Sequence, residues 1–184
     1  MMKLKEKYKR EVIPRMIEKF GYKNRMAVPR IEKVVVNTGF GRLIAGKTNE
    51  EQKKIYDSIL EDLSLIAGQR VVLKMAKKSI ATFKTRKGMP LGAAVTLRKE
   101  RMYDFLERLI FFTLPRTRDF RGIEQKSIDG KGNLNYGLKD HTVFVEILPE
   151  KVKNVFGLEV TVVTTAKNKE EGIELIKLMG FPIK

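Results

Sequence analysis

The residues from Gly41 to Thr48 have types and spacing that can hold the phosphates of a nucleotide. They read GRLIAGKT, which satisfies the phosphate-loop pattern G-x-x-x-x-G-K-[ST] between a predicted strand and a predicted helix. Glu50 and Glu51 follow at the start of that helix, where their charge would repel a triphosphate. No later predicted strand ends in an aspartate that would hold magnesium. A nucleotide-binding protein is therefore the alternative, and an ordinary strand-to-helix loop is the favoured interpretation.

Other groups that could do chemistry are few. Ser127, Asp129 and His141 are the residue types of a hydrolytic triad, but they lie on one polar segment without a nucleophile elbow. The chain has no cysteine and a single histidine, so thiolate zinc sites and multi-histidine metal centres are excluded. The run DGKGN at 129–133 could turn around a phosphate, or its glycines could simply permit positive φ. We predict a protein that is not an enzyme and uses no cofactor or metal.

A long basic stretch is the strongest signal in the sequence. The chain of 184 residues has a net charge of +16, which favours nucleic acid as partner, because no strongly basic amphipathic helix points to a membrane. No carboxylate lies between Asp62 and Glu100. An acid-free span of this length predicts contact with phosphates. Phe83 within it could stack on an exposed base or pack back on the sheet. The basic residues concerned are Lys74, Lys77, Lys78, Lys84, Arg86 and Lys87.

Hydropathy periodicity predicts the elements that position these residues. Strands are expected at 31–38, 70–74, 93–98, 142–147 and 158–165, and helices at 3–20, 48–67, 100–113 and 168–180. Pro14 predicts a break or restart in the first helix. This pattern indicates a single domain, 1–184, of the α+β class: a five-stranded, mostly antiparallel sheet with helices packed on one face. A long basic loop, the basic arm (residues 75–92), joins the second and third strands, and a polar loop spans 115–141.

An uncovered sheet face beside a basic arm is a recurring way to bind RNA. The polar loop adds Arg116, Arg118 and Arg121, which either contact phosphates or are solvated. No apolar run approaches the ~18 residues of a membrane span, and the N-terminal sequence lacks the apolar core of a signal peptide. A cytoplasmic protein without membrane contact is therefore expected.

Several long motifs resemble one known family over nearly the whole chain. EKVVVNTGFG, KKSIATFKTRKGMPLG, LPRTRDFRG, SIDGKGNLNYG and VVTTA occur in the order found in the fifth protein of the large ribosomal subunit in its bacterial form. There are departures from the family pattern. Ile128 replaces a usual Phe and Lys131 a usual Arg, which leaves stacking and bidentate phosphate contact at that turn open. Thr38 stands where relatives often have Met or Gln, and the G-K-T match is not a family motif.

The resemblance implies a non-enzymatic ribosomal protein of the central protuberance that takes part in translation. Its implied partners are 5S rRNA, 23S rRNA, the P-site tRNA, a protein of the small-subunit head reached through a bridge, and neighbouring 5S-associated proteins. It would be a monomer within the ribosome. The sheet-face positions that match 5S rRNA contacts are Asn37, Gln69, Thr96 and Arg98. The arm positions that match tRNA contacts are Lys77, Lys78, Ser79, Lys84, Arg86 and Lys87, and we expect Lys131 with the three arginines to add RNA contacts.

Overall fold

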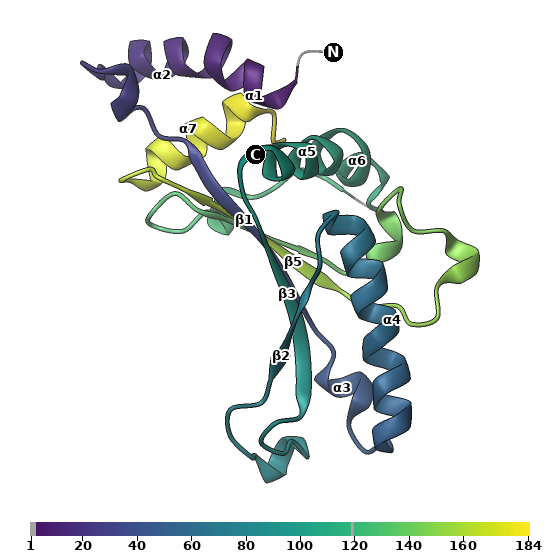
Figure 1. The fold of residues 1–184 in the computed structure, drawn as a ribbon. Helices are drawn as coiled ribbons and strands as arrows, with labels where there is room; N and C mark the ends of the chain where they lie inside the picture. The colour runs from purple at the N-terminus through teal and green to yellow at the C-terminus, as the bar shows by residue number, and fades with distance from the viewer. Residues whose placement is uncertain (1–2, 119) are drawn as a thin grey trace. The chain divides into compact units, whose positions relative to one another are not determined.

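The computed structural model describes residues 3–118 and 120–184 and contains one five-stranded sheet within them (Figure 1). The strands lie in the order β2-β3-β1-β5-β4, and β2 pairs antiparallel with β3 with a register irregularity between Lys74 and Met75. This confirms the predicted α+β class and the five-stranded, mostly antiparallel sheet. The strands are β1 (Ile31–Gly39), β2 (Val72–Met75), β3 (Pro90–Leu97), β4 (Leu134–Leu138) and β5 (Leu158–Thr164).

The predicted helices are present, and two of them contain π-helical turns. The first runs without a break from Leu4 to Phe20, with a π turn at Tyr8–Val12 just before Pro14, so the helix neither breaks nor restarts at the proline. Proline removes one backbone N–H from this helix, and the Arg25 guanidinium donates a hydrogen bond to the Lys9 carbonyl oxygen of the preceding turn at 3.1 Å. The helical segments are α1 (Leu4–Lys7), α2 (Ile13–Phe20), α3 (Gly41–Ile44), α4 (Asn49–Ala67), α5 (Lys99–Arg108), a second π turn (Leu109–Thr113), α6 (Leu114–Arg116) and α7 (Lys169–Met179).

The chain forms two compact units. The first comprises the described residues of 1–35, 97–136 and 160–184. Its core includes Met16 of α2, Phe105 of α5 and Leu175 of α7, each with at most 1% of its surface exposed. Because apolar faces from several sequence-distant segments close over one another there, this core forms only when those segments meet.

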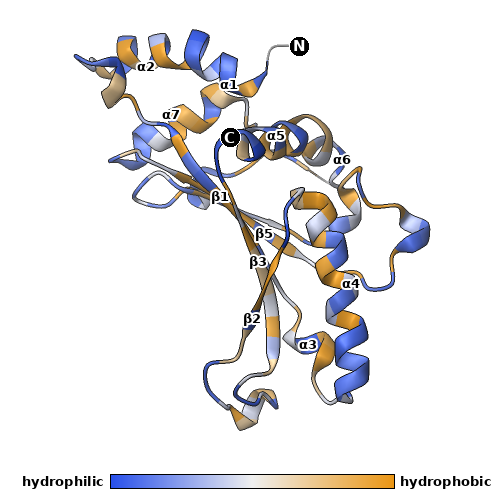
Figure 2. Ribbon diagram, viewed as in Figure 1, coloured by the Kyte–Doolittle hydropathy of each residue, from blue (hydrophilic) through white to orange (hydrophobic). Residues whose placement is uncertain are grey.

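The second unit comprises 36–96 and 137–159, and α4 supplies much of its core. Ile55, Ile59, Leu63 and Ile66 form a buried stripe along α4, which Figure 2 shows as hydrophobic residues along a helix that is otherwise hydrophilic. Val36 and Val95 on the strands of this unit are also buried, as expected when the apolar stripe of a helix packs on a sheet. Among the described residues, no helix lies over the opposite side of these strands (Figure 1).

A capping box starts α4. The Thr48 hydroxyl accepts a hydrogen bond from the Glu51 N–H at 3.5 Å, and the Glu51 carboxylate accepts one from the Thr48 N–H at 2.9 Å. The helix ends at Gly68, whose left-handed conformation, φ +63°, suits glycine. The sequence signals at both ends of this helix are therefore confirmed.

The predicted strand at 142–147 is wrong. Its start is a 3₁₀ turn, His141–Val143, in which the Asp140 carboxylate accepts a hydrogen bond from the Thr142 N–H at 2.7 Å. Phe144 and Ile147 are buried at a spacing of three residues, whereas a strand would bury every second one. The fourth strand is instead β4, Leu134–Leu138, which lies within the 115–141 segment that was predicted to be a polar loop.

Candidate nucleic-acid interface

The uncovered side of the second unit's sheet carries Asn37 and Thr96. On β1, Asn37 is exposed between buried Val36 and Thr38. On β3, Thr96 is exposed between buried Val95 and Leu97. Since side chains alternate across a strand, both polar residues point away from the α4 core. The structure therefore presents both predicted residues to solvent.

The rest of this side is built from small or uncharged residues, with one lysine. Val72 lies opposite Ala94, and Lys74 lies opposite Gly92. Gly92 is required, because a Cβ there would come within 2.6 Å of the Thr38 carbonyl oxygen. Short side chains let a ribose or a base edge approach the backbone of the strands closely. We call this surface the open face; its residues are Asn37, Val72, Lys74, Ala94 and Thr96.

Gln69 and Arg98, also predicted to bind RNA, have partners within the protein. The Gln69 side-chain amide donates a hydrogen bond to the Thr96 carbonyl oxygen at 3.3 Å, which ties it to the end of β3. In the first unit, Arg98 pairs with Glu32 at 3.5 Å between Nη1 and Oε1. Thr38, which departs from the family pattern, is buried and donates to the Gly157 carbonyl oxygen at 2.7 Å. It therefore contributes to packing and lies outside the open face.

The basic arm has more internal structure than its sequence indicated. Strands β2 and β3 reach Met75 and Pro90, so only residues 76–89 connect them. Within that connection Ile80 and Thr85 exchange two backbone hydrogen bonds of 3.1 Å around a 3₁₀ turn. The Ser79 hydroxyl accepts a hydrogen bond from the Lys87 N–H at 2.9 Å. Ser79 thus holds the arm in shape.

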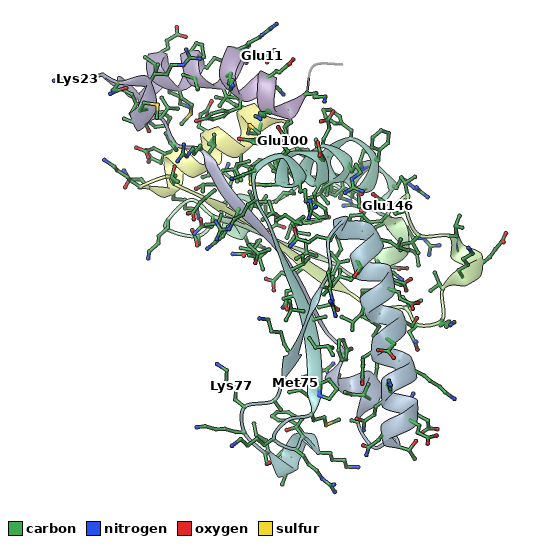
Figure 3. All side chains as sticks on the ribbon, viewed as in Figure 1. Glu11, Lys23, Met75, Lys77, Glu100 and Glu146 are labelled. Atoms are coloured by element: carbon green, nitrogen blue, oxygen red, sulfur yellow. The ribbon has the colours of Figure 1, made fainter. Side chains whose placement is uncertain are left out.

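The charges of the arm are all available to a partner. In the described part of the chain no carboxylate lies within ion-pair distance of these side chains, and Figure 3 shows Lys77 projecting from the arm. Phe83 is 67% exposed, so it does not pack back on the sheet. The surface can therefore neutralise phosphates and offer one ring for stacking. The exposed cations are Lys77, Lys78, Lys84, Arg86 and Lys87 of the arm, together with Lys74 of β2, which belongs to the open face.

Backbone N–H groups in the turn at 129–133 donate hydrogen bonds to a side chain of the turn itself. The Asp129 carboxylate accepts hydrogen bonds from the N–H groups of Lys131 at 2.9 Å and Asn133 at 2.8 Å. Burial alone would raise the pKa of Asp129, but the hydrogen bonds from Asn133 and Lys131 lower it overall. Asn133 also accepts from the Thr164 N–H at 2.9 Å. With these amides occupied and Ile128 buried, the glycines serve the turn and not a phosphate; the Lys131 side chain remains exposed.

The phosphate-loop match does not form a phosphate loop. Its first half is helix α3, Gly41–Ile44. The Thr48 N–H already donates to Glu51, and the Gln52 side chain donates to the Lys47 carbonyl oxygen at 2.8 Å. A nucleotide would find the start of α4 capped by the protein itself. The triad interpretation fails as well, because the ring nitrogens of His141 face Phe156 and Asp62 in the interior.

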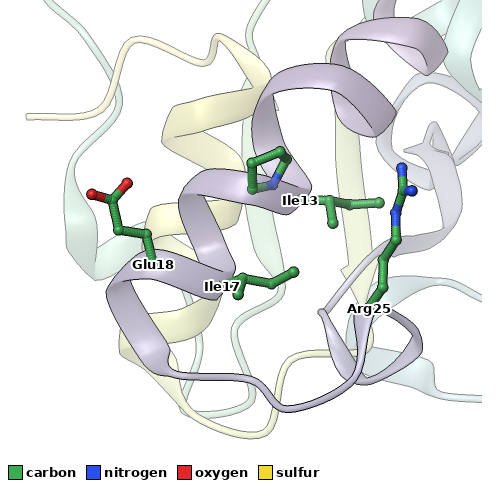
Figure 4. Close-up of a pocket in the computed structure, with 5 residues that line it drawn as sticks. Ile13, Ile17, Glu18 and Arg25 are labelled. Atoms are coloured by element: carbon green, nitrogen blue, oxygen red, sulfur yellow. The ribbon is translucent and has the colours of Figure 1, made fainter.

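A shallow hollow of about 450 Å³ on the N-terminal helix is lined by Ile13, Pro14, Ile17, Glu18 and Arg25 (Figure 4). The hollow on the N-terminal helix holds no group of side chains arranged for catalysis. Residues 3–118 and 120–184 contain no cluster of three metal-ligating side chains. Within the same residues, every helix is too short or too polar to cross a bilayer.

The open face and the basic arm define a class: a basic α+β protein with an exposed polar strand surface beside a cluster of cations, features that are typical of nucleic-acid-binding proteins. A family model described as ribosomal protein L5 matches residues 24–86, and a second one, described as the C-terminus of the same ribosomal family, matches residues 90–183. The chain belongs to the ribosomal protein L5 family.

Full-length relatives agree with this assignment. The chain is 53% identical over 182 residues to the large ribosomal subunit protein uL5 of Halothermothrix orenii, covering 99% of this chain and 98% of the relative. It is 53% identical to uL5 of Desulforapulum autotrophicum over 184 residues, covering 100% of this chain and 99% of the relative. The protein is therefore a ribosomal protein and not an enzyme, as the sequence predicted.

Proposed function

We propose that this ribosomal protein binds 5S rRNA in the large subunit of the cytoplasmic ribosome through its open face. The observation that carries the proposal is the exposure of Asn37 and Thr96 on strands without a covering helix. Amide and hydroxyl groups both donate and accept hydrogen bonds, which suits ribose hydroxyls and base edges. Gln69, which also holds the end of β3, and Arg98 are each proposed to bind 5S rRNA as well.

The basic arm is proposed to contact 23S rRNA and the P-site tRNA. Its unpaired cations and exposed Phe83 support this role. Further RNA contacts are proposed for Arg116, Arg118, Arg121 and Lys131, all of which are exposed. By the family resemblance we also propose the bridge to the small-subunit head and contacts with neighbouring 5S-associated proteins, with the chain present as a monomer.

The open face is tested by two substitutions. Asn37→Ala and Thr96→Ala should each weaken binding of the full-length protein to 5S rRNA by roughly fivefold, the cost of about 1 kcal/mol for a lost hydrogen bond. Fluorescence anisotropy with labelled 5S rRNA measures this. Gln125→Ala, an exposed amide on a 3₁₀ turn, is the matched control. If a variant with both Asn37→Ala and Thr96→Ala keeps its melting temperature and binds 5S rRNA as tightly as the control, the open face does not hold 5S rRNA.

A further inference from the structure

A groove of about 950 Å³ lies in the second unit between the basic arm and the start of α4. One wall is the arm, with Lys84, Arg86 and Lys87. The other wall includes Lys47 and Gln52, from the segment that matched the phosphate-loop pattern. Four cationic side chains therefore line one concave surface, and none of its lining residues is a carboxylate.

Both walls are held by hydrogen bonds inside the protein. On the α4 side, Gln52 donates to the Lys47 carbonyl oxygen at 2.8 Å, and the Glu51 carboxylate is turned back onto the Thr48 N–H at 2.9 Å. On the arm side, the Gly88 N–H donates to the Ala76 carbonyl oxygen at 2.9 Å. The Glu51 carboxylate is thus engaged in the helix cap, and the cations face a groove that is already formed.

We propose that this groove holds a short stretch of single-stranded RNA by its phosphates, with Lys47 acting from the wall opposite the arm. The proposal rests on the proposed function of the arm and extends it to a segment outside the arm. Four cations facing one hollow match a chain of phosphates, and each neutralised phosphate releases counterions. The volume is near the upper end of small-ligand sites, so it admits part of one strand and not a duplex.

The chemistry of the lining favours a polymer backbone over a free nucleotide. No aromatic residue lines the groove, so nothing there stacks a base. Phe83, the sequence neighbour of Lys84, is exposed outside this lining, where it could stack a base of the same RNA. The start of α4 is capped by Thr48 and Glu51, which leaves side-chain cations rather than backbone amides to hold phosphate.

The test compares Lys47→Ala with Lys53→Ala in the full-length protein. Lys53 is exposed on α4 outside the groove, so both changes remove one positive charge. With a fluorescent poly(U) probe of about 12 nucleotides, Lys47→Ala should lower the salt slope by about 0.7 and weaken binding about fivefold at about 0.1 M salt. For Lys53→Ala, the changes in salt slope and in affinity should each be at most half of those for Lys47→Ala. The Lys47 carbonyl oxygen that Gln52 uses remains in the variant, and melting temperatures check the fold.

Several results would contradict the proposal that the groove binds single-stranded RNA. Equal losses for Lys47→Ala and Lys53→Ala would do so, as would an equal loss on a duplex RNA of the same length. Saturable binding of ATP with magnesium that Lys47→Ala abolishes would make the groove a nucleotide site instead. The proposed function fails separately: if the groove alone is wrong, 5S rRNA still binds and Asn37→Ala still weakens it. If the wild-type protein does not bind 5S rRNA at all, the proposed function fails as well.

Discussion

Among single residues, His141 shows how burial fixes a protonation state. It is fully buried and stacked on Phe156 with ring centroids 3.9 Å apart. Its Nδ1 accepts the Phe156 N–H at 3.4 Å, so the ring proton of the neutral form lies on Nε2, 3.6 Å from the Asp62 carboxylate. Burial lowers the pKa of His141 despite the nearby carboxylates of Asp62 and Asp140. Burial likewise raises the pKa of Asp62, which Glu61 also raises and Lys153 lowers.

This pKa shift predicts a loss of stability in mild acid. The folded pKa of His141 lies below the unfolded value of about 6.5, so the unfolded chain takes up the proton first as pH falls. The free energy of unfolding should drop by at most ~1.4 kcal/mol per pH unit below that value. The raised pKa of Asp62 acts in the opposite sense, but only from about pH 4 upward, where the folded state holds the extra proton.

Denaturant unfolding at about pH 7.5 and about pH 5.5, on either side of the ordinary histidine pKa, measures the effect. His141→Gln should be less stable at the higher pH and show a flatter pH dependence. Because the chain has one histidine, its ring signal in NMR spectra reports the titration directly. A folded-state titration at or above about 6.5 would contradict the prediction.

Gly172 is fixed by a close backbone approach. A Cβ at position 172 would lie 2.2 Å from the Gly132 Cα, so Gly172→Ala must push α7 away from the 129–133 turn. Overpacking of this kind typically costs about 1–3 kcal/mol, and chemical denaturation should show a loss of at least that size. Gly130→Ala, in the same turn with nothing within 4 Å of the new Cβ, is the control. Equal stability of the two variants would show that the backbone around Gly172 and Gly132 can move apart at no cost in stability.

Among the elements, those with local signals could be predicted and those that depend on distant partners could not. The capping box and apolar stripe of α4 are both local. Strand β4 contains Asn135 and Gly137, which strands disfavour. It is held by long-range contacts such as the 2.8 Å hydrogen bond from the Thr161 hydroxyl to Asn135. The alternation at 142–147 was misleading because a side-chain cap at Asp140 starts a turn there.

The α4 cap predicts a measurable loss at one hydroxyl. Thr48→Ala removes the side-chain acceptor and should lower the free energy of unfolding by about 1 kcal/mol. Thr48→Ser keeps the hydroxyl and should retain most of the stability. Urea titrations compare the two variants, which both lack the threonine methyl group and differ from each other only in the hydroxyl. If the alanine and serine proteins unfold together, the cap does not stabilise α4.

Over the whole molecule, the charge pattern of the sequence was enough to predict one part of the candidate site, the basic arm. The basic arm could be found because its acid-free run is contiguous in the sequence. The groove wall at Lys47 could not be found in this way, because Lys47 is far from the arm along the chain. The phosphate-loop pattern around Lys47 also suggested a nucleotide as the ligand. The open face needed strand placement as well, since only alternation with buried neighbours shows that Asn37 and Thr96 point outward.

The charge distribution predicts strongly salt-dependent RNA binding. If about five phosphates are contacted, log affinity for 5S rRNA plotted against log salt concentration should have a slope of roughly −3.5 to −4.5. Asn37→Ala should lower the affinity and leave the slope unchanged, because an amide neutralises no phosphate. Anisotropy titrations from about 50 to about 300 mM KCl measure both quantities. A slope near zero would contradict an electrostatic role for the arm.

Strand β2 has a consequence for the protein before it meets its partners. It is an edge strand of only four residues, which includes Lys74 and has a register irregularity between Lys74 and Met75. A free edge is a template on which another chain can add a strand and begin aggregation, and short length, lysine and irregular register all hinder such addition. We therefore expect the β2 edge to resist pairing with a strand of a second copy of the chain.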